Sequence, residues 1–114
     1  MPHEAARLGP LLDAMRAEPT GDWPLAVLAA RAGMSRRTFL RRFADATGTT
    51  PARWRLGLRL DHARDLLEQP DMALAAVAEA TGFATVATLR HHFRRRFATT
   101  PAAYRAGLTA MPPR

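Results

Sequence analysis

Apolar residues recur at helical spacing along nearly the whole chain, and no stretch alternates as a strand does. The first apolar stripe predicts a helix that ends before Pro19, and its members are Leu8, Leu11, Leu12 and Met15. A second stripe, Leu25, Leu28, Ala29 and Ala32, is followed by Gly33, which tolerates the positive φ of a helix end. The pattern therefore predicts an all-α fold.

Two further helices follow in the first half of the chain. Ser35 can cap a third helix that closes at Gly48, with Phe39, Phe43 and Ala46 on its apolar face. Pro51 suits the first turn of a fourth helix that runs to about Glu68, with Leu56, Leu60, Ala63 and Leu67 on one side. At 1.5 Å per residue this helix spans roughly 26 Å, enough to hold two subdomains apart. The segment 69–71 then breaks it.

The chain repeats itself with a shift of 50 residues. Phe43 then meets Phe93, Trp54 meets Tyr104, Arg55 meets Arg105, and the segment TTPA at 49–52 meets TTPA at 99–102. Upstream the shift is 49, so Gly33 meets Gly82. Two copies are too few for a solenoid. We therefore expect a first subdomain at 1–50, a linker helix at 51–69, and a second subdomain at 70–114 that ends in a frayed tail.

The second copy predicts the same elements as the first. A helix carries Leu74, Val77, Ala78 and Thr81, a turn follows at Gly82–Phe83, and the next helix turns Leu89, Phe93 and Phe97 inward. A short last helix runs from Pro101 through Tyr104, which brings the total to about seven. Ala98 stands where the first copy has Gly48. Because alanine tolerates positive φ poorly, we expect a strained or different turn before Pro101.

The arrangement of each copy is the helix-turn-helix pattern, whose second helix enters the major groove of DNA. The net charge is +7, and all 17 basic residues are arginine. Residues 31–59 carry +7 and residues 79–105 carry +4, whereas residues 60–78 carry −3. Such clustering is what binding to phosphates requires, although arginine-rich faces can also be merely solvated helix surfaces. Two copies with arginines on the same exposed face favour DNA binding.

The motifs resemble those of the AraC/XylS-type transcription regulators, from about Leu8 to Leu108. The residues that carry the resemblance in the first half are Leu28–Ala29, Gly33–Ser35, Arg41, Phe43, Gly48–Pro51, Arg59, Ala63 and Leu66–Leu67; in the second half they are Val77–Ala78, Gly82–Phe83, Leu89, Phe93, Phe97, Pro101 and Tyr104–Arg105. The segments 50–54 and 89–93 look most like the subgroup with an amidotransferase-like (PfpI-like) N-terminal domain. The chain is too short to hold such a domain, so we expect an isolated DNA-binding portion or a stand-alone regulator without an effector or dimerisation domain.

Helix geometry selects candidate base-reading residues. With Phe39 and Phe43 inward, the third helix turns Arg36, Arg37, Leu40 and Arg41 outward. Arg37 and Arg41 can reach guanine O6 and N7, and Leu40 can contact a thymine methyl. The resemblance implies base reading at Arg37, Leu40 and Arg41 as well. The same geometry in the second copy selects Val86, Ala87, Arg90 and His91.

We expect the second recognition helix to discriminate less than the first, because Val86 and Ala87 offer only apolar contact. Contacts to the DNA backbone are expected from hydroxyls and further arginines, namely Ser35, Arg42, Thr50, Arg53, Thr85, Thr88, Arg94 and Arg95. The resemblance suggests a structural role for Arg59, bracing the linker helix.

Catalysis, metals and cofactors are not expected. The chain has no cysteine, so it has no disulfide, thiolate site or cysteine nucleophile. His91 and His92 are adjacent and diverge by about 100° on a helix, so they cannot chelate one metal together. Asp61 and Asp65 flank Arg64 and favour a solvated acidic face. No apolar run approaches the roughly 18–20 residues that span a bilayer, and no leader opens the chain, so we expect a soluble cytoplasmic protein without membrane contact.

The expected partner is double-stranded DNA, and RNA polymerase is a second candidate. We expect one chain to contact two adjacent major-groove segments, roughly 34 Å apart. Two alternatives remain at this point. One is a non-specific architectural or RNA-binding helical protein, and the other is a basic helical module that meets an acidic protein surface.

Overall fold

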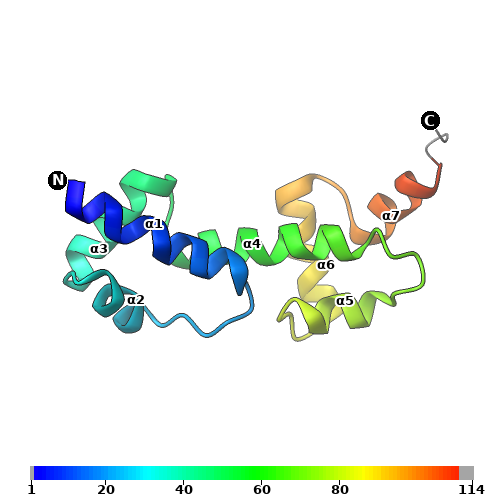
Figure 1. Cartoon of the computed structure of the whole chain (residues 1–114). Coiled ribbons are helices and arrows are strands. Elements are labelled where there is room, and N and C mark those ends of the chain that lie inside the picture. Colours follow the sequence, from blue (N-terminus) through cyan, green and yellow to red (C-terminus); the bar gives the residue numbers. More distant parts are fainter. Residues whose placement is uncertain (1, 111–114) are drawn as a thin grey trace. The chain divides into compact units, whose positions relative to one another are not determined.

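The computed structural model describes residues 2–110, with side chains from Arg7 to Leu108. This part of the chain forms seven α-helices and no strand, so the predicted all-α fold and its helix number are confirmed (Figure 1). The helices are α1 (Pro2–Ala17), α2 (Leu25–Ala32), α3 (Arg36–Thr47), α4 (Pro51–Leu66), α5 (Leu74–Ala80), α6 (Val86–Phe97) and α7 (Pro101–Ala110). Of the frayed tail expected after Tyr104, residues 105–110 are helical instead, and residues 111–114 lie outside the described residues.

Helix ends agree closely with the sequence patterns, with one exception. α4 ends at Leu66, two residues before the predicted end, and α1 ends at Ala17 ahead of Pro19. The last helix is longer than predicted, because it continues from Tyr104 to Ala110. The added turns are mainly alanine and leucine, which favour helix, and one glycine is not enough to end them.

Backbone contacts divide the chain into two compact units, residues 1–58 and residues 59–114. The boundary falls inside α4, so the first half of this helix belongs to the first unit and the second half to the second. Within the first unit α2 and α3 form a helix-turn-helix, and within the second unit α5 and α6 do so. Gly33 and Gly82 supply positive φ in the two turns, at +69° and +81°.

The core of the first unit centres on two phenylalanines of α3. Phe39 and Phe43 are fully buried, and the Phe43 ring lies 5.6 Å from that of Phe39 and 5.6 Å, edge-on, from that of Trp54. Ala46, expected on this face, is exposed. Thr47 occupies the inward position instead, because it lies four residues after Phe43, and its hydroxyl donates to the Phe43 carbonyl at 2.8 Å.

The second unit repeats this arrangement. Leu89 and Phe93 of α6 are fully buried, and the Phe93 ring lies 6.0 Å, edge-on, from that of Tyr104, the counterpart of Trp54. Thr81 is buried too, and its hydroxyl donates to the Val77 carbonyl at 2.7 Å. This bond removes the penalty of burying a hydroxyl among apolar side chains.

The structure also shows an equivalence that the sequence comparison missed. α1 in the first unit and the second half of α4 in the second, extended by the next residue, bury residues 52 positions apart. The pairs are Leu8 with Leu60, Leu11 with Ala63 and Met15 with Leu67, which directly follows α4. Arg7 and Arg59 are paired by the same offset, and each donates to the carbonyl of the turn glycine, Gly33 or Gly82, at 3.4 and 2.6 Å. Each unit therefore begins with the same kind of helix.

The turn after α6 carries the strain expected at Ala98, which is the one described non-glycine residue with positive φ, at +60°. We expect Ala98→Gly to raise stability by about 0.5–1 kcal/mol, since relief of left-handed strain outweighs the added freedom of the unfolded chain. Thermal unfolding followed by circular dichroism measures the change.

The first unit offers a matched control. Gly48 ends α3 at φ +79°, and a Cβ there would meet nothing within 4 Å. Gly48→Ala should therefore lower stability through backbone strain alone and by a similar amount. If Ala98→Gly lowered the melting temperature while Gly48→Ala left it unchanged, the positive φ would not be the source of strain.

Candidate DNA interface

The outward face of α3 presents all four of its candidate base-reading residues. Arg36, Arg37 and Arg41 are exposed, and Leu40 is 38% exposed, which is unusual for a large apolar residue in this chain. They share this face because Phe39 and Phe43 anchor the opposite side of the helix in the core. Among the described residues, none of the three arginines forms a hydrogen bond or an ion pair, so the helix offers three guanidinium groups to a ligand.

The corresponding face of α6 differs in detail. Ala87, Arg90 and His91 are exposed as predicted, whereas Val86 is half-buried. A groove of about 360 Å³ runs along this face and is lined by Ala87, Arg90, His91, Arg94 and Arg95. Three of the expected base-reading residues of α6 and its two expected backbone-contacting arginines therefore line one groove.

Three of the hydroxyl groups that we expect to contact the DNA backbone also cap helices of the protein. Ser35 Oγ accepts from the Thr38 amide at 3.2 Å, Thr85 Oγ1 from the Thr88 amide at 3.0 Å, and Thr50 Oγ1 from the Arg53 amide at 3.3 Å. A hydroxyl that accepts in a cap keeps its own hydrogen for donation. Ser35 and Thr50 can thus donate to a phosphate, while Thr85 and Thr88 already share a hydrogen bond of 2.9 Å.

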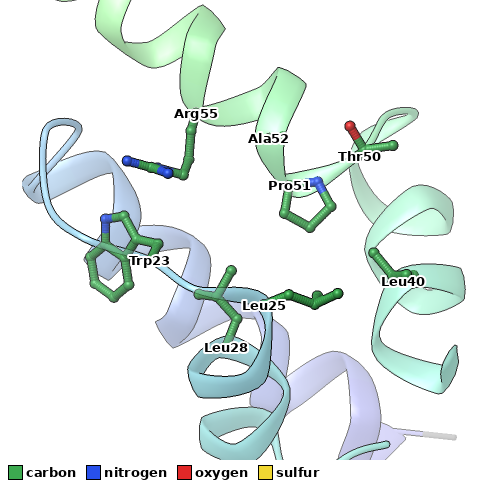
Figure 2. Close-up of a pocket in the computed structure, with 8 residues that line it drawn as sticks. All are labelled: Trp23, Leu25, Leu28, Leu40, Thr50, Pro51, Ala52 and Arg55. Atoms are coloured by element: carbon green, nitrogen blue, oxygen red, sulfur yellow. The ribbon is translucent and has the colours of Figure 1, made fainter. Parts of the chain in front are cut away.

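A shallow apolar hollow of about 200 Å³ lies between α3 and the start of α4 in the first unit. Figure 2 shows Leu40 of α3 on one side of it, Pro51 and Thr50 above, and Leu25 and Trp23 toward the other side. The Arg55 guanidinium lies near Trp23 and donates to the Gly21 carbonyl at 2.8 Å. The hollow brings one candidate base reader, Leu40, and one candidate backbone contact, Thr50, to the same part of the surface.

The arginines that we expect to contact the DNA backbone differ in their exposure to solvent. Arg53, Arg94 and Arg95 are exposed, whereas Arg42 is half-buried and its Nε atom is enclosed. Arg42 is therefore less available to a phosphate than the other three. Its contact with DNA stays a prediction.

Several arginines have structural bonds that sequence reasoning largely missed. Arg55 and Arg105, which the repeat aligns, both donate to backbone carbonyls; those of Arg105 are at Leu67 and Gln69, each at 3.1 Å. The repeat indicates a shared structural role, because in both copies an arginine directly follows the aromatic residue, Trp54 or Tyr104. Arg96 forms a two-pronged pair with Asp61, with N to O distances of 3.0 and 3.1 Å.

Arg59 has the structural role that the resemblance suggests. Its Nε donates to the Thr81 carbonyl at 2.8 Å, and its guanidinium lies 4.2 Å from the centre of the Phe83 ring. These contacts hold α4 against the turn between α5 and α6. Arg59 is thus committed to the turn rather than presented to a ligand.

Burial lowers the pKa of His92, and the neighbouring His91, Arg59 and Arg95 lower it further. The ring of His92 lies 6.1 Å from that of Phe83. The lowered pKa favours the neutral form of the His92 side chain.

Histidines and carboxylates do not form a metal site among the described side chains: from Arg7 to Leu108, no three of them gather where a metal ion could be held. None of the helices described within residues 2–110 has both the length and the apolar character needed to cross a membrane.

Comparisons with known proteins bear directly on this geometry. Residues 28–107 match the family described as a helix-turn-helix domain. The solved DNA-binding domain of AdpA, in complex with a target DNA, is 40% identical with a TM-score of 0.82, over 91% of this chain and 94% of that chain. A solved transcriptional regulator from Chromobacterium violaceum, described as an AraC-type DNA-binding domain protein, is 30% identical with a TM-score of 0.84 over 96% of both chains. The chain belongs to the AraC/XylS-type helix-turn-helix family.

Two curated helix-turn-helix relatives are longer than this chain. The transcriptional activator RclR of Escherichia coli is 33% identical over 107 residues, which are 94% of this chain and 38% of RclR. The regulator CdhR of Pseudomonas aeruginosa is 40% identical over 86 residues, which are 75% of this chain and 26% of CdhR. The chain thus spans about a quarter to two fifths of the length of these relatives.

Proposed function

We propose that this chain binds double-stranded DNA sequence-specifically and regulates transcription, with α3 and α6 as its recognition helices. The observation that carries the proposal is that both helix-turn-helix units turn unpaired arginines outward from the second helix, while other arginines are bonded to the fold. The AdpA domain, similar over most of its length, was solved with a target DNA. Guanidinium groups suit this role because they match both phosphates and guanine edges.

In this proposal the first turns of the recognition helices read bases and the flanking groups hold the backbone. The base-reading set is Arg36, Arg37, Leu40, Arg41, Val86, Ala87, Arg90 and His91. The backbone set is Ser35, Arg42, Thr50, Arg53, Thr85, Thr88, Arg94 and Arg95. The exposure of Arg37 and Arg41, one turn apart on α3, supports guanine recognition.

The proposal extends to the protein context. It describes a binding protein rather than an enzyme, acting in the bacterial cytoplasm where its DNA lies. The segments 50–54 and 89–93 support a parent with an amidotransferase-like N-terminal domain. If the chain activates transcription, the proposal includes contact with RNA polymerase. Activation is the role stated in the name of the relative RclR.

Selection of bound duplexes from a random pool, followed by competition with bulk DNA, tests the proposal. We expect a single preferred site that outcompetes bulk DNA by roughly 10³-fold or more. The site should be asymmetric, because one chain carries both recognition helices. Equal affinity for all duplexes would favour a non-specific binder, and no retardation near physiological salt would favour a protein-interaction module.

Base reading and backbone contact are separated by two arginine variants. We expect Arg41→Ala to weaken binding by about 1–3 kcal/mol and to relax preference at one base pair, since Arg41 lies on the exposed face near the start of α3. Arg94→Ala should weaken binding to all sequences alike, because Arg94 lies in the last turn of α6. Fluorescence anisotropy against a panel of single-base changes measures both. Uniform losses over the panel for Arg41→Ala would reject its base-reading role.

A further inference from the structure

The two recognition helices carry their cations at opposite ends. α3 has Arg36 and Arg37 in its first turn and no basic residue in its last. α6 opens with Val86 and Ala87 and has Arg94, Arg95 and Arg96 in its last turn. The shift of 50 aligns Arg37 with Ala87, and Asp45 with Arg95. The two helices therefore meet a ligand with different chemistry at the same structural position.

Helix stability explains the distribution in α6 but not that in α3. The end of a helix carries partial negative charge and favours cations, whereas its start carries partial positive charge and disfavours them. Arg36 and Arg37 thus lie where the helix itself is least favourable to them. Contact with a ligand explains better why Arg36 and Arg37 lie in the first turn of α3. Ala87 holds the position of α6 that aligns with Arg37, so it should contact the ligand there too.

The structure separates the two apolar residues that open α6. Val86 is half-buried and lines a hollow on the side of the turn, together with Gly82, Phe83 and Thr85. Ala87 is exposed and lines the other groove, beside Arg90 and His91. Of the two, only Ala87 shares its surface with the cationic residues of the helix.

We propose that Ala87 is a specificity-determining residue whose methyl group packs on the 5-methyl of a thymine in the half-site bound by α6. This inference rests on the proposed function. The first turn of a recognition helix reaches the base edges, and alanine is one of the residues that contact the thymine methyl. Arg94 and Arg95, at the far end of the same groove, hold phosphates and fix the depth of the helix. At the aligned positions of the two helices, Arg37 of α3 then reads guanine and Ala87 of α6 reads thymine.

Replacement of single thymines by deoxyuridine tests the inference, because it removes the methyl group and leaves every hydrogen-bonding group in place. The full chain is titrated by fluorescence anisotropy with its selected site and with each singly substituted site. The half-site of α3 is the one in which Arg41→Ala relaxes base preference. In the other half-site, one thymine should lose about fourfold in affinity upon substitution, the value of one buried methyl group.

Three variants assign the effect to its residue. Ala87→Gly should bind the thymine and deoxyuridine sites equally. Ala84→Gly, the matched control, should keep the fourfold difference, since Ala84 lines the other hollow and belongs to neither DNA-contacting set. Ala87→Arg, which copies the residue at the aligned position of α3, should shift preference at that base pair toward guanine. Circular dichroism checks that each variant is folded.

The outcomes distinguish this inference from the function on which it rests. If selection yields no preferred site, the proposed function fails and the inference fails with it. If a site is selected but contains no methyl-sensitive thymine in the α6 half, only the inference is overturned. It is also overturned if Ala87→Gly retains the sensitivity of the parent chain.

Discussion

Affinity for the selected site should fall by about 10³–10⁴-fold when monovalent salt rises from 50 to 200 mM. The exposed guanidinium groups of α3 and α6 displace condensed counterions from each phosphate that they neutralise. For six to eight phosphate contacts, the logarithm of the binding constant should fall with that of salt at a slope of roughly −5 to −7. Fluorescence anisotropy over a salt series gives the slope directly.

The structure also predicts which arginines set that slope. Arg94→Ala should make it shallower by about one, as expected for the loss of one phosphate contact. Arg105→Gln is the matched control, because Arg105 is bonded to the carbonyls of Leu67 and Gln69 and is not free to neutralise a phosphate. A slope near −2 for the parent chain would contradict a binding surface built from both recognition helices.

The second large effect concerns stability. Phe43→Ala should lower the free energy of unfolding by about 3–5 kcal/mol, because a fully buried ring packed on Phe39 and Trp54 would leave a cavity. Both tryptophans of the chain, Trp23 and Trp54, lie in the unit of residues 1–58. Urea unfolding followed by tryptophan fluorescence therefore reports on that unit, while circular dichroism reports on the helices of both.

Phe93→Ala is the counterpart in the second unit, where Phe93 packs on Phe97 and Tyr104. It should produce a loss of similar size, seen mainly by circular dichroism. Leu40→Ala, on the exposed face of α3, should change stability by no more than about 0.5 kcal/mol. An unchanged fluorescence midpoint in Phe43→Ala would show that the Phe43 ring is not part of the core of the first unit.

The order and type of the helices follow from the sequence because the local signals agree with the packing. The helix ends predicted by the apolar stripes agree with the ends marked by single residues. Gly33 and Gly48 mark where helices end, and Ser35 and Pro51 mark where helices begin. The last helix was misjudged at Tyr104 because nothing local ends it there, and propensity continues it to Ala110. Ala46 was placed inward because alanine fits either side of a helix, whereas the hydroxyl of Thr47 fits inside by bonding to Phe43.

The sequence predicts which helix face carries the candidate site, but it does not predict which arginines are hydrogen-bonded within the fold. Helical phase fixes which side of α3 carries Arg37 and Arg41, since two phenylalanines fix the opposite side. It does not distinguish an arginine presented to solvent from one bonded to a distant carbonyl. Arg7 lies 26 residues from Gly33 and Arg105 lies 38 from Leu67, so only tertiary packing brings these pairs together. Val86 and Ala87 likewise differ in burial although they are adjacent.

The alanine at the end of α6 bears on how such domains are recognised in sequences. At Ala98 the backbone keeps the left-handed geometry of Gly48 although alanine carries a Cβ, which disfavours that geometry. The path of the turn is set by its surroundings, including the Thr100 hydroxyl that caps α7 through the Ala103 amide at 3.1 Å. A search that requires glycine at this point would pass over the second unit of chains like this one. The Thr-Pro pair that opens the following helix is present in both units of this chain, at 50–51 and 100–101.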